Sequence, residues 1–401
     1  MFGFFKKTGP GTLVAAAFIG PGTVTVCTLA GVGFGYALLW AMALSVTATV
    51  VLQEMAARIG IITGMGLAEV IKAQLRHRFL KIPVIVLVFS AVVIGNAAYE
   101  AGNLSGASLG MAGVFPEELI RFYPLLTGMV AFVLLYAGSY KVLERCMTVM
   151  VLVMSLSFIC AAVMTGPDMG EVLQGLFIPQ VPEGSILTII GLIGTTVVPY
   201  NLFLHASLVR ERWSGAGDLK AARKDTLLFV LLGGLVSTAI IITAAGNGLT
   251  GVENVMDMAK GLEPVYGRFA VYFIGTGLFA AGITSSITAP LAAAYVANGC
   301  FGWNASLKDT RFRLVWMIVI GTGVLFASAG FNPIELILFA QVANGILLPV
   351  VALFLWWAVN RTGVLGRYKN TLVQNLLSGG IILVTVILGI RSILKVLGWG
   401  E

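Results

Sequence analysis

Charged residues are scarce in this sequence. Only 11% of its 401 residues are Asp, Glu, Lys or Arg, whereas 58% are hydrophobic, and the mean hydropathy is +0.96. A water-soluble chain of this length needs much more polar surface to cover its core. The composition therefore excludes a soluble protein and predicts an all-α protein that crosses the membrane many times.

Residues that commonly carry catalysis or hold structural metals are also few. The sequence has two histidines and four scattered cysteines, which are Cys27, Cys146, Cys160 and Cys300. A disulfide framework or a zinc site would need paired spacings. No connection between hydrophobic segments holds a nucleophile with a base or a phosphate-binding glycine loop. We therefore predict no enzyme activity and no cofactor, and we interpret the cysteines as small apolar residues.

Hydrophobic runs of about 18 to 25 residues, which is the length that crosses a bilayer, recur from one end of the chain to the other. We predict eleven membrane spans, at residues 10–34, 36–62, 82–104, 122–139, 142–165, 184–209, 227–249, 266–298, 312–330, 333–359 and 372–397.

The basic residues are distributed unevenly over the connections between these spans. Of the 25 Lys and Arg residues, five lie in one set of alternate connections, and the other 20 lie in the set that begins with Lys6 and Lys7. The five are Arg121, Lys260, Arg268, Arg391 and Lys395. Because cytoplasmic loops are enriched in basic residues, we predict a plasma (inner) membrane protein with its N-terminus in the cytoplasm and its C-terminus outside. The net charge of +7 is then a topology signal and does not indicate a nucleic-acid partner.

Two predicted spans, the first and the sixth, contain residues that interrupt helices. The first contains the stretch Gly20-Pro21-Gly22-Thr23, and the sixth contains Pro199. Irregular backbone at membrane depth is tolerated where it lines a cavity, and matching breaks in two halves of a chain indicate an inverted-repeat transporter. Two ordinary proline kinks are the alternative. We predict one repeat at residues 1–165, a second at 166–360, and an eleventh helix at 361–401.

Several ordered motifs make the chain similar to the Nramp family of divalent-metal and proton cotransporters. These motifs are Gly35–Trp40, Lys141–Glu144, Pro199–Val209, Gly277–Thr288 and Ala340–Val342. The resemblance covers nearly the whole length. It implies a leucine-transporter-like (LeuT-like) fold of two inverted five-helix repeats plus one helix, and secondary active transport by alternating access.

The resemblance does not extend to the metal ligands of that family. Members that carry manganese or iron have Asp-Pro-Gly-Asn in helix one and Met-Pro-His in helix six. This chain has Gly20 in place of the Asp and Thr23 in place of the Asn. It has Val198 in place of the Met and Tyr200 in place of the His. Transition metals prefer sulfur, imidazole and carboxylate groups, and magnesium prefers oxygens that include a carboxylate. Neither break supplies such a group.

We therefore expect a small polar or zwitterionic solute as cargo, held by glycine-flanked helix ends that present unpaired amides and carbonyls. One alternative is a symporter of protons and a magnesium- or manganese-like divalent cation with a rebuilt site, and another is a receptor that transports nothing. An inactive metal carrier also stays open. The candidate substrate-binding residues are Gly20, Pro21, Gly22, Thr23, Thr195, Val198, Tyr200, Gln341 and Asn344. We expect a monomer.

Charged and titratable side chains inside spans are usually functional or paired. Glu54 and Arg58 are four residues apart, so we interpret them as a structural pair. The family resemblance suggests proton coupling through Glu100, since buried carboxyl groups can exchange protons near neutral pH; a solvated carboxylate at the outer mouth of its helix is the alternative. His205 matches a family histidine on the inward route, and a simple hydrogen-bonded histidine is the alternative.

Overall fold

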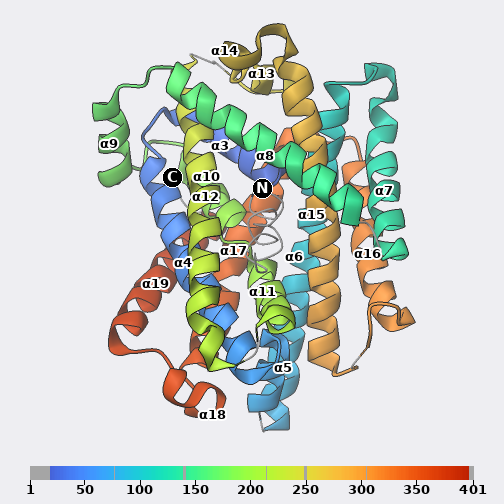
Figure 1. The fold of residues 1–401 in the computed structure, drawn as a ribbon, viewed down its shortest axis with the longest axis vertical. Helices are drawn as coiled ribbons and strands as arrows, with labels where there is room; N and C mark the ends of the chain where they lie inside the picture. The colour runs from blue at the N-terminus through green and yellow to red at the C-terminus, as the bar shows by residue number, and fades with distance from the viewer. Residues whose placement is uncertain are drawn as a thin grey trace.

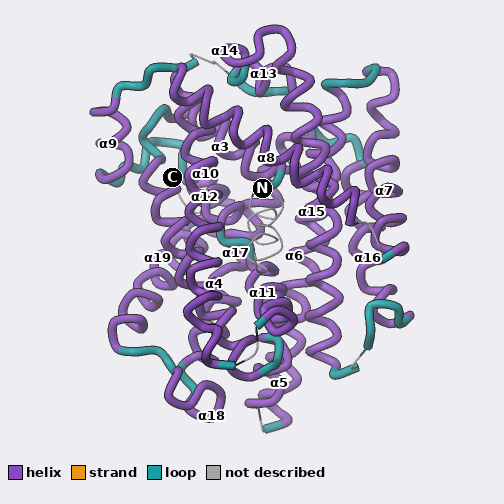
Figure 2. The backbone as a smooth tube through the Cα atoms, viewed as in Figure 1, coloured by secondary structure: helices purple, strands orange, loops and turns teal. Residues whose placement is uncertain are grey.

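The computed structural model describes residues 19–75, 77–138, 141–213, 215–247, 251–303 and 305–396. Over these ranges the regular secondary structure is entirely helical (Figures 1 and 2). The main helices are α3 (Pro21–Phe34), α4 (Leu39–Thr63), α5 (Leu67–Gln74), α6 (Arg78–Ala112), α7 (Tyr123–Ala137), α8 (Lys141–Met164), α9 (Met169–Phe177), α10 (Ile186–Thr196), α11 (Pro199–Arg212), α12 (Leu219–Gly246), α15 (Ala270–Phe301), α16 (Thr310–Ala327), α17 (Pro333–Val359) and α19 (Leu372–Val396). Short helical turns complete the set: η1 (Glu117–Phe122), η2 (Ala216–Asp218), α13 (Val255–Lys260), α14 (Glu263–Tyr266), η3 (Gly267–Phe269), α18 (Thr362–Leu365) and η4 (Gly366–Tyr368).

Each of the eleven predicted spans contains at least one of these helices, although the part of the first span before residue 19 lies outside the described residues. Among the described helices, nine are long and apolar enough to cross a membrane, and α8 with α9 makes a tenth candidate that is bent by 119°. The protein is therefore a multi-pass helical membrane protein. Two boundaries differ clearly from the prediction: α6 continues to Ala112 beyond the predicted end at residue 104, and α12 begins at Leu219, before the predicted start at residue 227.

The connections gather at two opposite ends of the helix bundle (Figure 1). Helices α9, α13 and α14 lie at one end, and α5 and α18 lie at the other. The alternate connections predicted from the sequence place α9, α13 and α14 on one side of the membrane and α5 and α18 on the other. The fold agrees with this alternation. Which end faces the cytoplasm, and the division into two repeats, stay predictions.

Helix α6 is the central element of the packing, since α15, α17 and α16 all pack along it. Small residues allow these close approaches. A side chain at Gly110 would overlap the backbone of Gly275 in α15, and one at Gly282 would overlap the backbone of Asn103 in α6. Membrane helices commonly pack through such small residues. The close packing fixes α6 against α15, α16 and α17.

Candidate functional site

The break in the first predicted span is a helix start. Gly20 has extended backbone (φ −93°, ψ 178°), and α3 begins at the next residue, Pro21. Proline suits this first position because its fixed φ is helical and its missing N–H would be unpaired there anyway. The Gly20 carbonyl accepts the amides of Thr23 (3.1 Å) and Val24 (3.3 Å), and no side chain caps the helix. A helix therefore begins at the predicted position, and the part of the span before residue 19 lies outside the described residues.

The sixth predicted span divides into α10 and α11. Helix α10 ends at Thr196, and α11 begins at Pro199 after two non-helical residues, Val197 and Val198. Val198 is the N-cap residue and offers no side-chain hydrogen bond. Both breaks thus begin a half-helix whose first amides have no side-chain cap, and such amides carry partial positive charge.

The two breaks meet in space. The hydroxyl groups of Thr23 in α3 and Thr195 in α10 are 2.9 Å apart, although 172 positions separate them. Both side chains are buried. This contact brings together two of the residues that the sequence placed at the site.

Gln341 of α17 lies between the breaks. A Cβ atom at Gly22 would overlap its side-chain amide, and a Cβ atom at Gly194 in α10 would overlap its backbone carbonyl. The glycines of both broken spans therefore make room for Gln341. Asn344, one helical turn further along α17, is buried as well.

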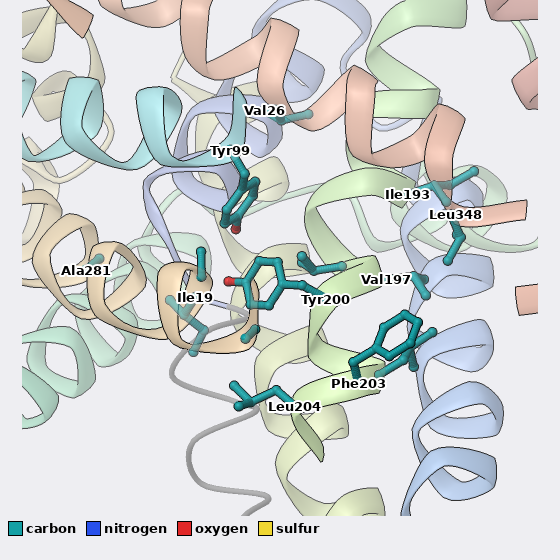
Figure 3. Packing of buried hydrophobic residues seen from close by; sticks show 14 of the residues in the cluster. Ile19, Val26, Tyr99, Ile193, Val197, Tyr200, Phe203, Leu204, Ala281 and Leu348 are labelled. Atoms are coloured by element: carbon teal, nitrogen blue, oxygen red, sulfur yellow. The ribbon is translucent and has the colours of Figure 1, made fainter. Parts of the chain in front are cut away.

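Tyr200 of α11 packs against Tyr99 of α6. Their ring centroids are 5.3 Å apart and the planes meet at 63°, which is an edge-to-face contact (Figure 3). The Tyr99 hydroxyl lies beside the Tyr200 hydroxyl and the Gln341 side chain. Thr288 of α15 is a further polar neighbour of Tyr200.

Glu100 lies inside α6 and is fully buried. Asn103 Nδ2 donates a 3.3 Å hydrogen bond to its Oε2, Ser286 of α15 lies close to the carboxyl group, and Gly323 of α16 packs against its Cβ and Cγ atoms. No basic side chain forms an ion pair with it within the described ranges. The alternative of a solvated carboxylate at the mouth of the helix is therefore wrong.

Several buried polar atoms in this region have no hydrogen-bond partner among the described residues. They are Tyr200 Oη, Gln341 Oε1, Asn344 Nδ2, Glu100 Oε1 and the hydroxyls of Ser285 and Ser286. Buried polar groups in proteins are almost always paired with protein, water or ligand. Their concentration beside the two breaks is what a binding site for a polar cargo requires.

His205 lies further along α11 and is also fully buried. Its Nδ1 is 2.7 Å from Oε1 of Gln53 in α4, so the ring donates a hydrogen bond to that amide oxygen, while Nε2 has no partner among the described residues. His205 is therefore hydrogen-bonded inside the protein, as the alternative interpretation expected. A role for His205 in proton movement stays a prediction.

The chemistry of the assembled site is that of oxygen donors. In the described part of the chain, no group of three or more His, Cys, Asp and Glu side chains could hold a metal ion. The site instead combines hydroxyls, side-chain amides and the single carboxyl group of Glu100. Such a set is unsuited to ions that need sulfur or imidazole, and it suits hydrated or oxygen-preferring ions and polar solutes.

Two neighbours of the site, Tyr99 and Gln53, were not predicted from the sequence. Tyr99 packs on Tyr200, and Gln53 pairs with His205. Both are polar residues within otherwise apolar spans, and Tyr99 directly precedes Glu100. A search for uncharged polar residues inside spans would have found them.

Comparison with known proteins gives consistent results over the whole chain. A family model described as "Natural resistance-associated macrophage protein-like" (Nramp) matches residues 11–395. The divalent metal cation transporter MntH of Erwinia tasmaniensis is 27% identical over 98% of this chain and 94% of its own length. A solved structure of the Eremococcus coleocola manganese transporter shares the fold with a TM-score of 0.76 at 20% identity, covering 96% of this chain and 86% of that one. The amino-acid complex of MhsT with L-phenylalanine has a TM-score of 0.61 at 15% identity, covering 96% and 97%.

Proposed function

Because the protein belongs to the Nramp family, whose model covers nearly the whole chain, we propose that it is a secondary active transporter of a divalent metal cation of the oxygen-preferring, magnesium- or manganese-like class. This is the alternative that the sequence left open. The MntH relatives of Erwinia tasmaniensis and Caldanaerobacter subterraneus, which are named divalent metal cation transporters, favour this alternative over the preferred expectation of a small polar solute.

The observation that supports this cargo is the burial of Glu100 beside the site. The breaks themselves contain no carboxylate, but α6 brings Glu100 to the site, because Glu100 directly follows Tyr99, whose ring packs on Tyr200. A carboxylate buried without a cation costs several kcal/mol. A cation in the site, or a proton on the carboxyl group, offsets that cost. Magnesium-like ions typically use one or two carboxylates together with neutral oxygens and retained water.

The same carboxyl group makes proton coupling part of the proposal. Glu100 is positioned to exchange a proton when the cation enters or leaves, because either a proton or the bound cation compensates the negative charge of its buried carboxylate. His205 is a second candidate on the same path, since its Nε2 is free of protein partners among the described residues. We also propose that the chain works as a monomer with its N-terminus in the cytoplasm.

A small polar or zwitterionic solute is the second candidate. The uncapped starts of α3 and α11 favour it, because their amides would bind a carboxylate group of the cargo. The absence of acid, sulfur or imidazole in residues 20–23 and 195–200 also favours it.

A thermal-shift screen of the purified protein separates the two candidates, because a specific ligand stabilises the state that it binds. We expect magnesium or manganese salts to raise the melting temperature in a saturable way at constant ionic strength, and amino acids to have no effect. The shift should disappear in Gln341→Leu. Gly20→Asp should strengthen the cation effect by adding a carboxylate, whereas in a solute carrier the same change should abolish ligand stabilisation. Stabilisation by organic solutes alone would overturn the proposal.

A further inference from the structure

We propose that Tyr99 of α6 is a positioning residue of the central site, which holds Tyr200 of α11 and Gln341 of α17 with their polar groups toward the cargo. Figure 3 shows the side chains of Tyr99 and Tyr200 next to each other. The inference depends on the proposed function only for the choice of cargo in the transport test. Neither candidate cargo changes the geometry that supports it.

The first argument is the place of Tyr99 on α6. Tyr99, Gly102 and Gly106 follow one another at helical spacing, so they lie on one face of α6. A side chain at Gly102 would press on Ala340, which is the neighbour of Gln341 in α17, and a side chain at Gly106 would overlap Pro21 in the first break. This face of α6 therefore contacts both α3 and α17 at the level of the site.

The second argument is the contact between the two tyrosine rings. Tyr99 and Tyr200 are each 1% exposed and meet edge to face, with centroids 5.3 Å apart. Such a geometry is a preferred arrangement of aromatic pairs. It limits the orientations that the Tyr200 ring can adopt, and Tyr200 is the second residue of a helix that begins in a break.

The third argument concerns the groups that need positioning. Tyr200 Oη and Gln341 Oε1 have no hydrogen-bond partner among the described residues, so no protein hydrogen bond fixes these two atoms. The Tyr99 hydroxyl lies beside both side chains. Through Tyr99, the unbroken helix α6 thus restrains the side chains of Tyr200 in α11 and Gln341 in α17.

The transport test uses Tyr99→Phe, which keeps the ring and removes only the hydroxyl. We expect KM for the transported cation in proteoliposomes to rise about five- to tenfold, because the polar neighbour of both side chains is lost, while the maximal rate stays within about twofold. Tyr200→Phe combined with Tyr99→Phe should cost less than the sum of the two single effects. The matched control is Tyr123→Phe, which removes a buried hydroxyl that donates to the Pro116 carbonyl in another part of the fold.

Three results would overturn the inference: a wild-type KM in Tyr99→Phe, additive effects of the two tyrosine changes, or an equal effect of Tyr123→Phe. If the wild-type protein transports a polar solute and no divalent cation, the proposed cargo is wrong, and the same variants test Tyr99 on that solute.

A measurement without cargo makes the test independent of the proposed function. In protein labelled with 3-fluorotyrosine, the ¹⁹F resonance of Tyr200 is identified by its loss in Tyr200→Phe. It should move in Tyr99→Phe, where the ring contact remains and only the hydroxyl is missing, and should stay in place in Tyr123→Phe. An unchanged resonance in Tyr99→Phe would contradict the inference whatever the cargo is.

Discussion

Arg58 in α4 donates a 2.6 Å hydrogen bond to the amide oxygen of Asn370, which lies just before α19. Arg58 also donates to the Tyr368 carbonyl (2.9 Å) and forms a 3.0 Å ion pair with Glu54, whose other oxygen accepts a 2.8 Å bond from Arg223 of α12. The predicted structural pair of Glu54 and Arg58 is therefore confirmed. It is the centre of a network that joins α4, α12 and the chain before α19.

The network predicts a large difference between its two arginines. Arg58 is 2% exposed, so Arg58→Met should lower the free energy of unfolding by about 3 kcal/mol, because it leaves buried polar groups unpaired. Arg223 is 48% exposed, so Arg223→Met should cost less than about 1 kcal/mol. Melting temperatures in detergent measure both changes. Equal losses would contradict the structural role of Arg58.

Gly22 and Gly194 should behave differently when each is replaced by alanine. The new methyl group at Gly22 meets the movable side-chain amide of Gln341, so we expect a folded protein whose transport is reduced at least about tenfold. At Gly194 it meets backbone, which cannot move away, so we expect a loss of roughly 2 kcal/mol or more in stability. Transport assays and thermal melts on the same preparations compare them.

Gly33 provides the matched control in the same helix as Gly22. No atom lies within 4 Å of a Cβ built at this position, so Gly33→Ala should leave transport unchanged and should stabilise α3 by up to about 1 kcal/mol. Normal transport by Gly22→Ala, or a defect in Gly33→Ala as large as that of Gly22→Ala, would contradict the role given to the Gly22 contact.

Glu100→Gln should separate proton coupling from folding. The change keeps the shape of the side chain and its contact with Asn103, but the amide cannot take part in proton transfer. Cation uptake by the wild-type protein should increase when a proton gradient is directed inward, and uptake by Glu100→Gln should lose this dependence. Glu335→Gln, at an exposed position of α17, should retain it. A variant with wild-type pH dependence would exclude Glu100 as the coupling residue.

The membrane spans could be predicted from the sequence because a bilayer imposes a fixed length of apolar helix. The positions of the two breaks could be predicted from their prolines, since Pro21 and Pro199 begin helices in the structure. The end of α6 was misplaced because small and polar residues such as Asn103, Ser105 and Gly106 lower the hydropathy of a segment that is buried inside the bundle.

The site was only partly predictable. The sequence indicated that Thr23, Thr195 and Gln341 belong to it, because each lies in or beside an interrupted span or on an apolar helix where a polar group is unexpected. The meeting of Tyr99 with Tyr200, and the burial of Glu100 against Gly323, depend on how α6 packs on other helices. A local sequence pattern does not contain this information. The sequence therefore predicted a candidate site without a carboxylate, whereas the packing of α6 places Glu100 beside it.

Uptake by proteoliposomes tests the central claim most directly. With the purified protein as the only transporter, we expect saturable uptake of magnesium or manganese, stimulated by an inward proton gradient and strongly reduced in Gln341→Leu. Radiolabelled amino acids should not accumulate above the level of empty liposomes. Accumulation of an amino acid or another polar solute, together with no uptake of either cation, would contradict the account.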